Sequence, residues 1–200
     1  MLNVISLLLL VTLLLILVIV LSKKKLPFNN NTTRSKCIFD LLHIDIWGAC
    51  PVLAMRGFKY FLIVVDDCSH FTWTIPMPNK FVACKYIMDF VNYTETQFDT
   101  KLKSIRTDNG LEFCMTNFYA LKGIIHQTTC VETPEQNGIV EQKHQYLLNV
   151  VRALIFHAHL PTNFWCFALN HAAFFLSTTH LQRCLTMIPL KKFFMGNYRT

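Results

Sequence analysis

Residues 59–66 (KYFLIVVD) constrain the fold of this 200-residue chain more than any other segment does. The segment is a nearly continuous run of β-branched and aromatic residues, which is typical of a central strand buried on both faces. A strand of this kind must pair with neighbouring strands and be covered by other elements. The run therefore predicts a sheet that has this strand in its interior.

Strand-like and helix-like patterns extend on both sides of this run. They predict strands over residues 39–47, 59–66, 70–77, 102–107 and 124–129, and helices over residues 80–98, 113–121, about 133–158 and 162–179. In the first strand, one face is expected to carry Phe39, Leu41, His43, Asp45 and Trp47. The order of these elements predicts a mixed α/β layer whose first strands are antiparallel.

The composition is that of a globular domain with an apolar beginning. With 17 Phe, 52% hydrophobic and 16% charged residues, the chain is excluded from the disordered class. Its net charge of +7 includes three lysines at 23–25, so the remainder is mildly basic and permits an anionic partner without identifying one. The eight cysteines include no C-x-x-C pair, which favours free thiols in a reducing compartment over disulfides.

Residues 4–21 are apolar except for Ser6 and Thr12, and they divide the chain into an unusual leader and a body. Their length is at the short end for a membrane span, and the following lysines would keep the body of the protein cytosolic. A membrane anchor, an extension that is not native to the domain, and a buried helix all stay open. The sequence then divides into four regions: an apolar segment (1–22), a linker (23–37), a globular core (38–180) and a C-terminal tail of uncertain structure (181–200).

Three acidic residues occupy positions where a carboxylate needs an explanation. Asp45 stands inside an apolar strand, Asp108 ends a strand before Asn-Gly, and Glu141 falls in the first turns of a helix. If they converge, they repel one another and call for hard divalent cations such as Mg²⁺ or Mn²⁺. Two such ions, about 3.5–4 Å apart, serve phosphodiester chemistry. The alternative is a strand end, a turn start and a helix-dipole contact, and the residues alone leave both interpretations open.

Five blocks of sequence stand in an order that is more specific than any single motif. They are HIDIWG (43–48), GFKYFLIVVDDCSHFTW (57–73), IRTDNGLEF (105–113), GIIHQTTC (123–130) and TPEQNGIVEQKHQYLL (133–148). In this order they resemble the integrase catalytic core of copia-type retrotransposons, a member of the retroviral-type integrases in the RNase H-like superfamily. The likeness runs from about Lys25 to the C-terminus. It implies an RNase H-like α/β fold with a mixed five-stranded sheet flanked by helices.

The resemblance also implies a site and a reaction. By motif, the catalytic and metal-binding triad falls on Asp45, Asp108 and Glu141, with two Mg²⁺ or Mn²⁺ ions expected. Such enzymes trim DNA ends and join the new 3′-hydroxyls to target DNA. The implied partners are therefore the cDNA ends of the element, target DNA and, because two ends are joined, further copies of the chain. A location in the nucleus or cytoplasm follows, with a membrane as the alternative if residues 4–21 are an anchor.

Four further residues near the third acid are candidates for DNA contact. Gln136 and Asn137 stand on the loop before Glu141, and Lys143 and His144 stand just beyond it. The alternative is ordinary turn, capping and solvated-helix chemistry.

Three other acids are expected to have no catalytic role. Asp66 and Asp67 end a strand at a hairpin, and Glu112 follows Asp108 in the sequence.

The sequence departs from the family pattern in three places. Asp108 and Glu141 are separated by 32 residues, whereas the family usually has about 35 there, and the difference is expected to fall in the short helix near 113–122. Gln142 and Gln145 stand where the family often has arginine, and no His/Cys zinc module precedes the core. These departures predict a fragment or a decaying copy. They keep two alternatives open, namely an inactive nucleic-acid-binding relic and a related RNase H-like nuclease.

Overall fold

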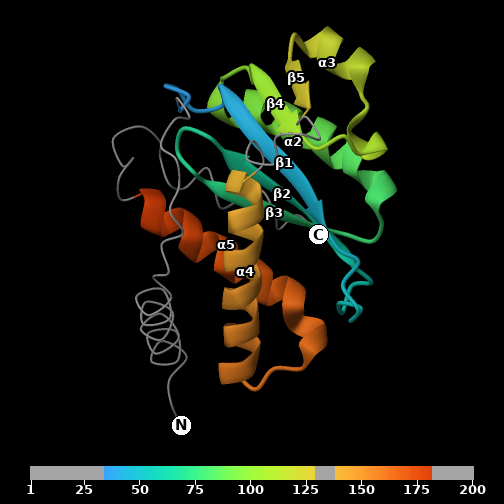
Figure 1. Cartoon of the computed structure of the whole chain (residues 1–200), viewed down its shortest axis with the longest axis vertical. Helices are drawn as coiled ribbons and strands as arrows, with labels where there is room; N and C mark the ends of the chain where they lie inside the picture. Colours follow the sequence, from blue (N-terminus) through green and yellow to red (C-terminus); the bar gives the residue numbers. More distant parts are fainter. Residues whose placement is uncertain (1–33, 129–137, 182–200) are drawn as a thin grey trace.

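The computed structural model describes residues 34–128 and 138–181, and within these ranges five strands form one twisted sheet (Figure 1). The strands are β1 (Leu41–Trp47), β2 (Tyr60–Asp66), β3 (Thr72–Met77), β4 (Ser104–Thr107) and β5 (Ile125–Thr128). Their order across the sheet is β3-β2-β1-β4-β5. The first three strands pair antiparallel, whereas β4 pairs parallel with β1 and β5 pairs parallel with β4. The predicted mixed five-stranded sheet is confirmed.

Helices cover both faces of this sheet. They are α2 (Ala83–Phe98), preceded by the 3-10 turn η1 (Lys80–Val82); η2 (Leu111–Phe113); α3 (Thr116–Lys122); α4 (Gly138–His157); η4 (Thr162–Phe164); and α5 (Trp165–Leu181). The side chain of Asn79 accepts a hydrogen bond from the Val82 backbone N–H and so caps η1. Asp99 ends α2 in the left-handed conformation that commonly terminates helices.

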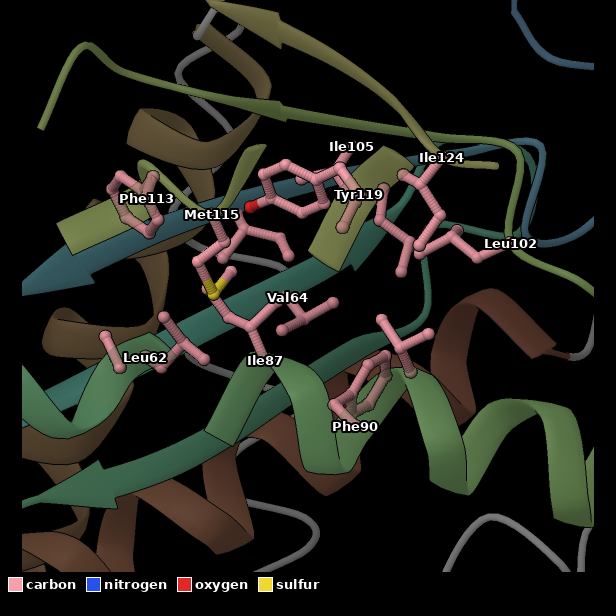
Figure 2. Close-up of a cluster of buried hydrophobic side chains, with 14 of the residues drawn as sticks. Leu62, Val64, Ile87, Phe90, Leu102, Ile105, Phe113, Met115, Tyr119 and Ile124 are labelled. Carbon is pink, nitrogen blue, oxygen red and sulfur yellow. The ribbon is translucent and has the colours of Figure 1, made fainter. Parts of the chain in front are cut away.

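The sheet separates two hydrophobic cores because successive residues of a strand point to opposite faces. On one face, Phe61 and Ile63 of β2 pack with residues of α4 and α5 such as Leu147 and Leu169. On the other face lie Leu62 and Val64 of β2 with side chains from α2, α3 and β4, and Figure 2 shows this second cluster from Ile87 and Phe90 to Tyr119 and Ile124. A strand buried on both faces is what the run at 59–66 predicts, and β2 confirms it.

The prediction that Phe39 shares a face with Asp45 is wrong. Phe39 has a positive φ of 62° and precedes β1, so the alternation of the strand does not reach it. Its buried ring packs in the second core, near Trp73 and Phe98. The predicted helix at 113–121 is also divided, since η2 and α3 are separated at Cys114 and Met115.

Some of the predicted regions lie outside the described residues. These are the apolar segment 4–21, most of the linker, the loop that carries Gln136 and Asn137, and the tail from 182 onwards. Among the helices of residues 34–128 and 138–181, none combines the length and the apolar character needed to cross a membrane.

Candidate active site

The sheet brings Asp45 and Asp108 to the same level. His43 of β1 pairs with Arg106 of β4 in parallel register, and each aspartate stands two residues further along its own segment. Because equal steps along two parallel neighbours lead to the same level of a sheet, the two aspartates lie side by side. Asp45 is half-buried on β1, whereas Asp108, just past the end of β4, is exposed.

Helix α4 adds the third acid from the face of the sheet that α4 and α5 cover. Glu141 is exposed and lies in the first turn of this helix, which packs on β1 and β2. His144 follows three residues later on the same side of the helix, and its Nδ1 lies 3.3 Å from Oδ2 of Asp45. The start of α4 therefore faces Asp45.

The electrostatics of Asp45 reflect this arrangement. The pKa of Asp45 is raised to about 6, chiefly by burial of the carboxyl and to a lesser extent by the negative charges of Asp108 and Glu141. The backbone N–H of Ile46, which donates to Oδ1 at 2.8 Å, and the positive charge of Lys80 act in the opposite direction. The charges of Asp108 and Glu141 therefore act on Asp45, and together with burial they outweigh the Ile46 hydrogen bond and the charge of Lys80.

A tight turn shapes the loop that follows Asp108. Oδ1 of Asp108 accepts a hydrogen bond from the Gly110 backbone N–H at 3.0 Å. A Cβ at position 110 would meet that same oxygen at 3.0 Å and the Glu112 carboxyl group at 2.9 Å, so a larger residue there would displace the ends of these two acidic side chains. Glu112 in turn lies 3.6 Å from the Lys80 amine, which places a lysine at the rim of the site.

The chemistry of the three side chains suits a hard cation, although they do not form a closed cage. Carboxylate oxygens are the ligands that Mg²⁺ and Mn²⁺ prefer, and a cation would favour the ionised form of Asp45, which burial and the neighbouring acids disfavour. In the part of the chain that the structure describes, no three His, Cys, Asp or Glu side chains are gathered tightly enough to hold a metal ion. The residues fit the ion in donor type, and the three would have to draw closer to share it.

The predicted DNA-contact residues differ in how far they are buried and in whether the structure describes them. Lys143 is half-buried on α4, and burial lowers its pKa to about 8. His144 is only 7% exposed and is turned toward Asp45, which leaves little of its ring for a phosphate. Gln136 and Asn137 lie outside the described residues. All four assignments stay predictions.

Sequence reasoning missed two neighbours of Asp45. Lys80 is near enough for its charge to act on the Asp45 carboxyl, and the His144 ring contacts that carboxyl directly. No motif marks Lys80, because it stands in a turn far from Asp45 in the sequence. The position of His144 one helical turn after Glu141 is the signal that could have predicted its contact.

A second group of acids, which we term the clasp carboxylates, consists of Asp66 and Asp67 at the end of β2. Asp66 accepts hydrogen bonds from the Phe39 N–H at 2.8 Å, the Ser69 N–H at 2.7 Å and the Ser69 hydroxyl at 2.6 Å. Asp67 accepts from the Ser35 N–H at 2.7 Å and its hydroxyl at 3.0 Å, and lies 3.1 Å from Nε2 of His43. These carboxylates tie the segment before β1 to the hairpin.

Comparison with known proteins gives matches of three kinds. Residues 37–134 match the family model described as the integrase core domain. The chain is 29% identical over 170 residues to the retrovirus-related Pol polyprotein from transposon RE2 of Arabidopsis thaliana, which covers 84% of this chain and 12% of that protein. It is 30% identical over 153 residues to the corresponding polyprotein from transposon TNT 1-94 of Nicotiana tabacum, covering 75% of this chain and 12% of the relative.

Among solved structures, the chain is similar to a chain of the simian T-cell lymphotropic virus intasome in complex with PP2A regulatory subunit B56 gamma. The TM-score is 0.57 at 16% identity, with 76% of this chain and 52% of that chain covered. At this identity the likeness bears on the fold, and the RNase H-like architecture predicted from the sequence is confirmed. The chain spans about 12% of the length of the polyproteins that it matches.

Proposed function

Because residues 37–134 match the family model of the integrase core domain and the chain resembles retrotransposon polyproteins, we propose that it is the catalytic core of a DNA integrase. The reaction would be metal-dependent trimming of the 3′ ends of element DNA, followed by transfer of those ends to target DNA. The partners would be the two kinds of DNA and other copies of the chain, in the nucleus or the cytoplasm.

One observation carries this proposal. The charges of Asp108 and Glu141 act on the half-buried carboxyl of Asp45, although the three residues are far apart in the sequence. Like charges that a fold gathers at one end of a sheet repel one another, and a bound ligand can supply the opposite charge that offsets this repulsion. A divalent cation with a DNA phosphate is the ligand that such a group of carboxylates fits.

The residues of the chain would prepare this site. Asp45, Asp108 and Glu141 would hold Mg²⁺ or Mn²⁺, two ions being expected, and the metal would activate the attacking oxygen and stabilise the leaving one. Hydrogen bonds from Ile46 N–H to Asp45 and from Gly110 N–H to Asp108 fix one oxygen of each carboxylate. The remaining lone pairs of these groups are left for the cation.

Positive side chains around the acids would receive the DNA backbone. Lys80 lies at the rim, and its only ion pair in the described residues is the loose contact with Glu112 at 3.6 Å. Lys143 has no ion-pair partner within residues 34–128 and 138–181, and its half-buried amine would gain most from a phosphate. Gln136 and Asn137, which precede α4 in the sequence, would contact the same DNA backbone.

A second function, a DNA-binding relic without catalysis, is favoured by one observation. The three carboxylates do not form a ready metal cage within the described residues, and the interval from Asp108 to Glu141 is 32 residues instead of the usual ~35. An active RNase H-like nuclease would share the same acids and would differ only in using water alone as the nucleophile.

A strand-transfer assay with Mn²⁺ separates these functions. The full chain is incubated with a duplex that carries the element's terminal sequence and with a plasmid target, beside its Asp108→Asn variant. Asp89→Asn is the matched control, since Asp89 is an exposed acid on α2, on the opposite face of the sheet from α4. Joined products from the parent and the control, but not from Asp108→Asn, support the integrase. Equal backgrounds from all three contradict it, and cleavage without joining indicates the nuclease.

A further inference from the structure

We propose that His144 is a positioning residue that donates its Nδ1–H to Asp45 and so presents the carboxylate in one orientation to the cation. The inference rests on the proposed function, because it concerns how that site holds its metal. It assigns to His144 a role that differs from the phosphate contact predicted from its sequence position.

The contact is specific to one atom on each side. Nδ1 of His144 lies 3.3 Å from Oδ2 of Asp45, and the two side chains are 9% and 18% exposed, respectively. Oδ1 of the same carboxylate accepts the Ile46 backbone N–H at 2.8 Å. Each carboxylate oxygen therefore has one protein partner, which leaves further lone pairs on both for a cation.

The tautomer follows from the partners of the two ring nitrogens. An ionised carboxylate can only accept hydrogen bonds, so the ring nitrogen beside it must carry the proton. The other nitrogen, Nε2, is buried and has no hydrogen-bond partner in the described part of the chain. A proton on Nε2 would leave a buried donor unpaired and place two acceptors against each other at Asp45. The neutral ring therefore carries its proton on Nδ1.

The surroundings of the ring hold it in place. Phe61 of β2 packs against the His144 ring edge to face, with centroids 5.5 Å apart and an interplanar angle of 79°. Glu141 stands one helical turn earlier on α4, so a single helix delivers one metal ligand and the group that orients another. Partners of metal-binding carboxylates that act in this way affect metal affinity by about 10–100-fold.

Two substitutions at position 144 separate orientation of Asp45 from packing. His144→Phe keeps a ring against Phe61 and removes the donor, whereas the amide nitrogen of His144→Asn takes the place of Nδ1. Mn²⁺ affinity of the full chain and both variants is measured by isothermal titration calorimetry, with thermal melting in the absence of metal. We expect His144→Phe to bind Mn²⁺ about 10–100-fold more weakly and His144→Asn to stay within about 5-fold of the parent.

The melting temperature distinguishes a structural role. His144→Phe removes the unpartnered Nε2 and should melt no lower than the parent. A folded His144→Phe variant that binds Mn²⁺ as tightly as the parent overturns the inference and leaves the proposed function intact. A parent chain that binds no Mn²⁺ overturns the proposed function itself, and with it the metal role of His144.

A measurement on the unaltered chain covers the case in which the variants do not fold. Long-range ¹H–¹⁵N correlation spectra of the histidine rings identify which nitrogen carries the proton. We expect His144 in the Nδ1–H form, in contact with Asp45. The Nε2–H form would overturn the hydrogen bond to Asp45 whether or not the chain binds metal.

Discussion

Two groups of carboxylates flank β1, and the hydrogen bonds that they receive differ. Beside the start of the strand, each of the clasp carboxylates Asp66 and Asp67 has three donors. Near its end, Asp45 has the Ile46 N–H and the His144 contact, and Asp108 has, among the described residues, the Gly110 N–H as its one donor. Acids that hold a fold together are saturated by protein donors, whereas acids that serve a ligand keep lone pairs free.

The pKa values distinguish Asp67 from Asp45, although burial raises the pKa of Asp66 as well. Burial would raise the pKa of Asp67, but hydrogen bonds from His43 and Ser35 outweigh burial and hold that pKa well below its ordinary value. At Asp45, burial and the neighbouring acids outweigh the single backbone hydrogen bond and raise the pKa to about 6. The protein therefore stabilises the ionised form of Asp67, whereas burial disfavours the ionised forms of Asp45 and Asp66.

The largest expected effect is on activity, through Glu141→Gln. The substitution keeps the shape of an exposed side chain but removes a negative charge that acts on Asp45. Strand transfer with Mn²⁺ should fall by about 10²–10³-fold, as when one group that stabilises transition-state charge is lost. The free energy of unfolding should change by no more than about 0.5 kcal/mol. If Asp66→Asn lowers the activity per folded molecule equally, the distinction between the two groups is broken.

The next effect is on stability, through Asp66→Ala. The substitution leaves the Phe39 N–H and both Ser69 donors without their acceptor in a buried place. Because each unsatisfied buried donor costs about 1–3 kcal/mol, the free energy of unfolding should drop by about 3 kcal/mol or more. Urea unfolding followed by tryptophan fluorescence measures the change. The exposed Asp89→Ala is the matched control, and an equal loss there would contradict the assignment.

The sequence was sufficient for the elements of this fold and insufficient for the partners of its acids. Period and turn signals predicted the five strands and the order of the helices, because repeating apolar positions determine which face is buried. The donors at Asp66 come from Phe39, which the strand pattern assigned to the wrong face, and from a serine in the hairpin. Such partners depend on a positive φ and on tertiary contacts, which no period encodes.

For the candidate site, the sequence predicted which residues carry the acids, but it did not predict which side chains surround them. Its three acids came from a resemblance to a family. The sheet register between β1 and β4 places Asp45 beside Asp108, and the packing of α4 onto β1 and β2 places Glu141. The inward turn of His144 was not predicted, because a helix position next to a polar loop reads as solvent-exposed. Burial depends on α4 packing onto β1 and β2, which is decided by the whole core.

A smaller effect, with opposite signs at Asp45 and Asp67, is expected from pH. Asp45 has a folded-state pKa of about 6 against an ordinary 3.8, so its folded form binds the proton more tightly. Stability linked to Asp45 is therefore present at low pH and is lost as the pH rises from about 4 to 6. For Asp67, whose pKa is lowered, stability is present above the ordinary value and is lost as the pH falls.

Two isosteric variants test these signs. Asp45→Asn should be more stable than the parent at pH 7 by roughly 2 kcal/mol, once solvent screening is allowed for, and equal to it at pH 4. Asp67→Asn should be less stable than the parent at pH 7, with the difference shrinking as the pH is lowered. Urea unfolding of the parent and of each variant at pH 7 and pH 4 gives the two stability differences at each pH. A stabilised Asp67→Asn at pH 7 would place both acids in the same class.

The smallest expected effect is the response to metal alone, and it compares the two groups within one molecule. Mn²⁺ at ten times its dissociation constant should stabilise the folded chain by about 1.4 kcal/mol, which raises the melting temperature by a few degrees in a chain of this size. The shift should vanish in Asp45→Asn, because the clasp carboxylates, with three donors each, have fewer lone pairs left for an ion. Mg²⁺ should act in the same direction, and removal of either ion with a chelator should restore the original melting temperature. An equal shift in Asp45→Asn would mean that the ion binds elsewhere. The number of hydrogen bonds that an acid accepts from the protein would then not distinguish structural acids from functional ones.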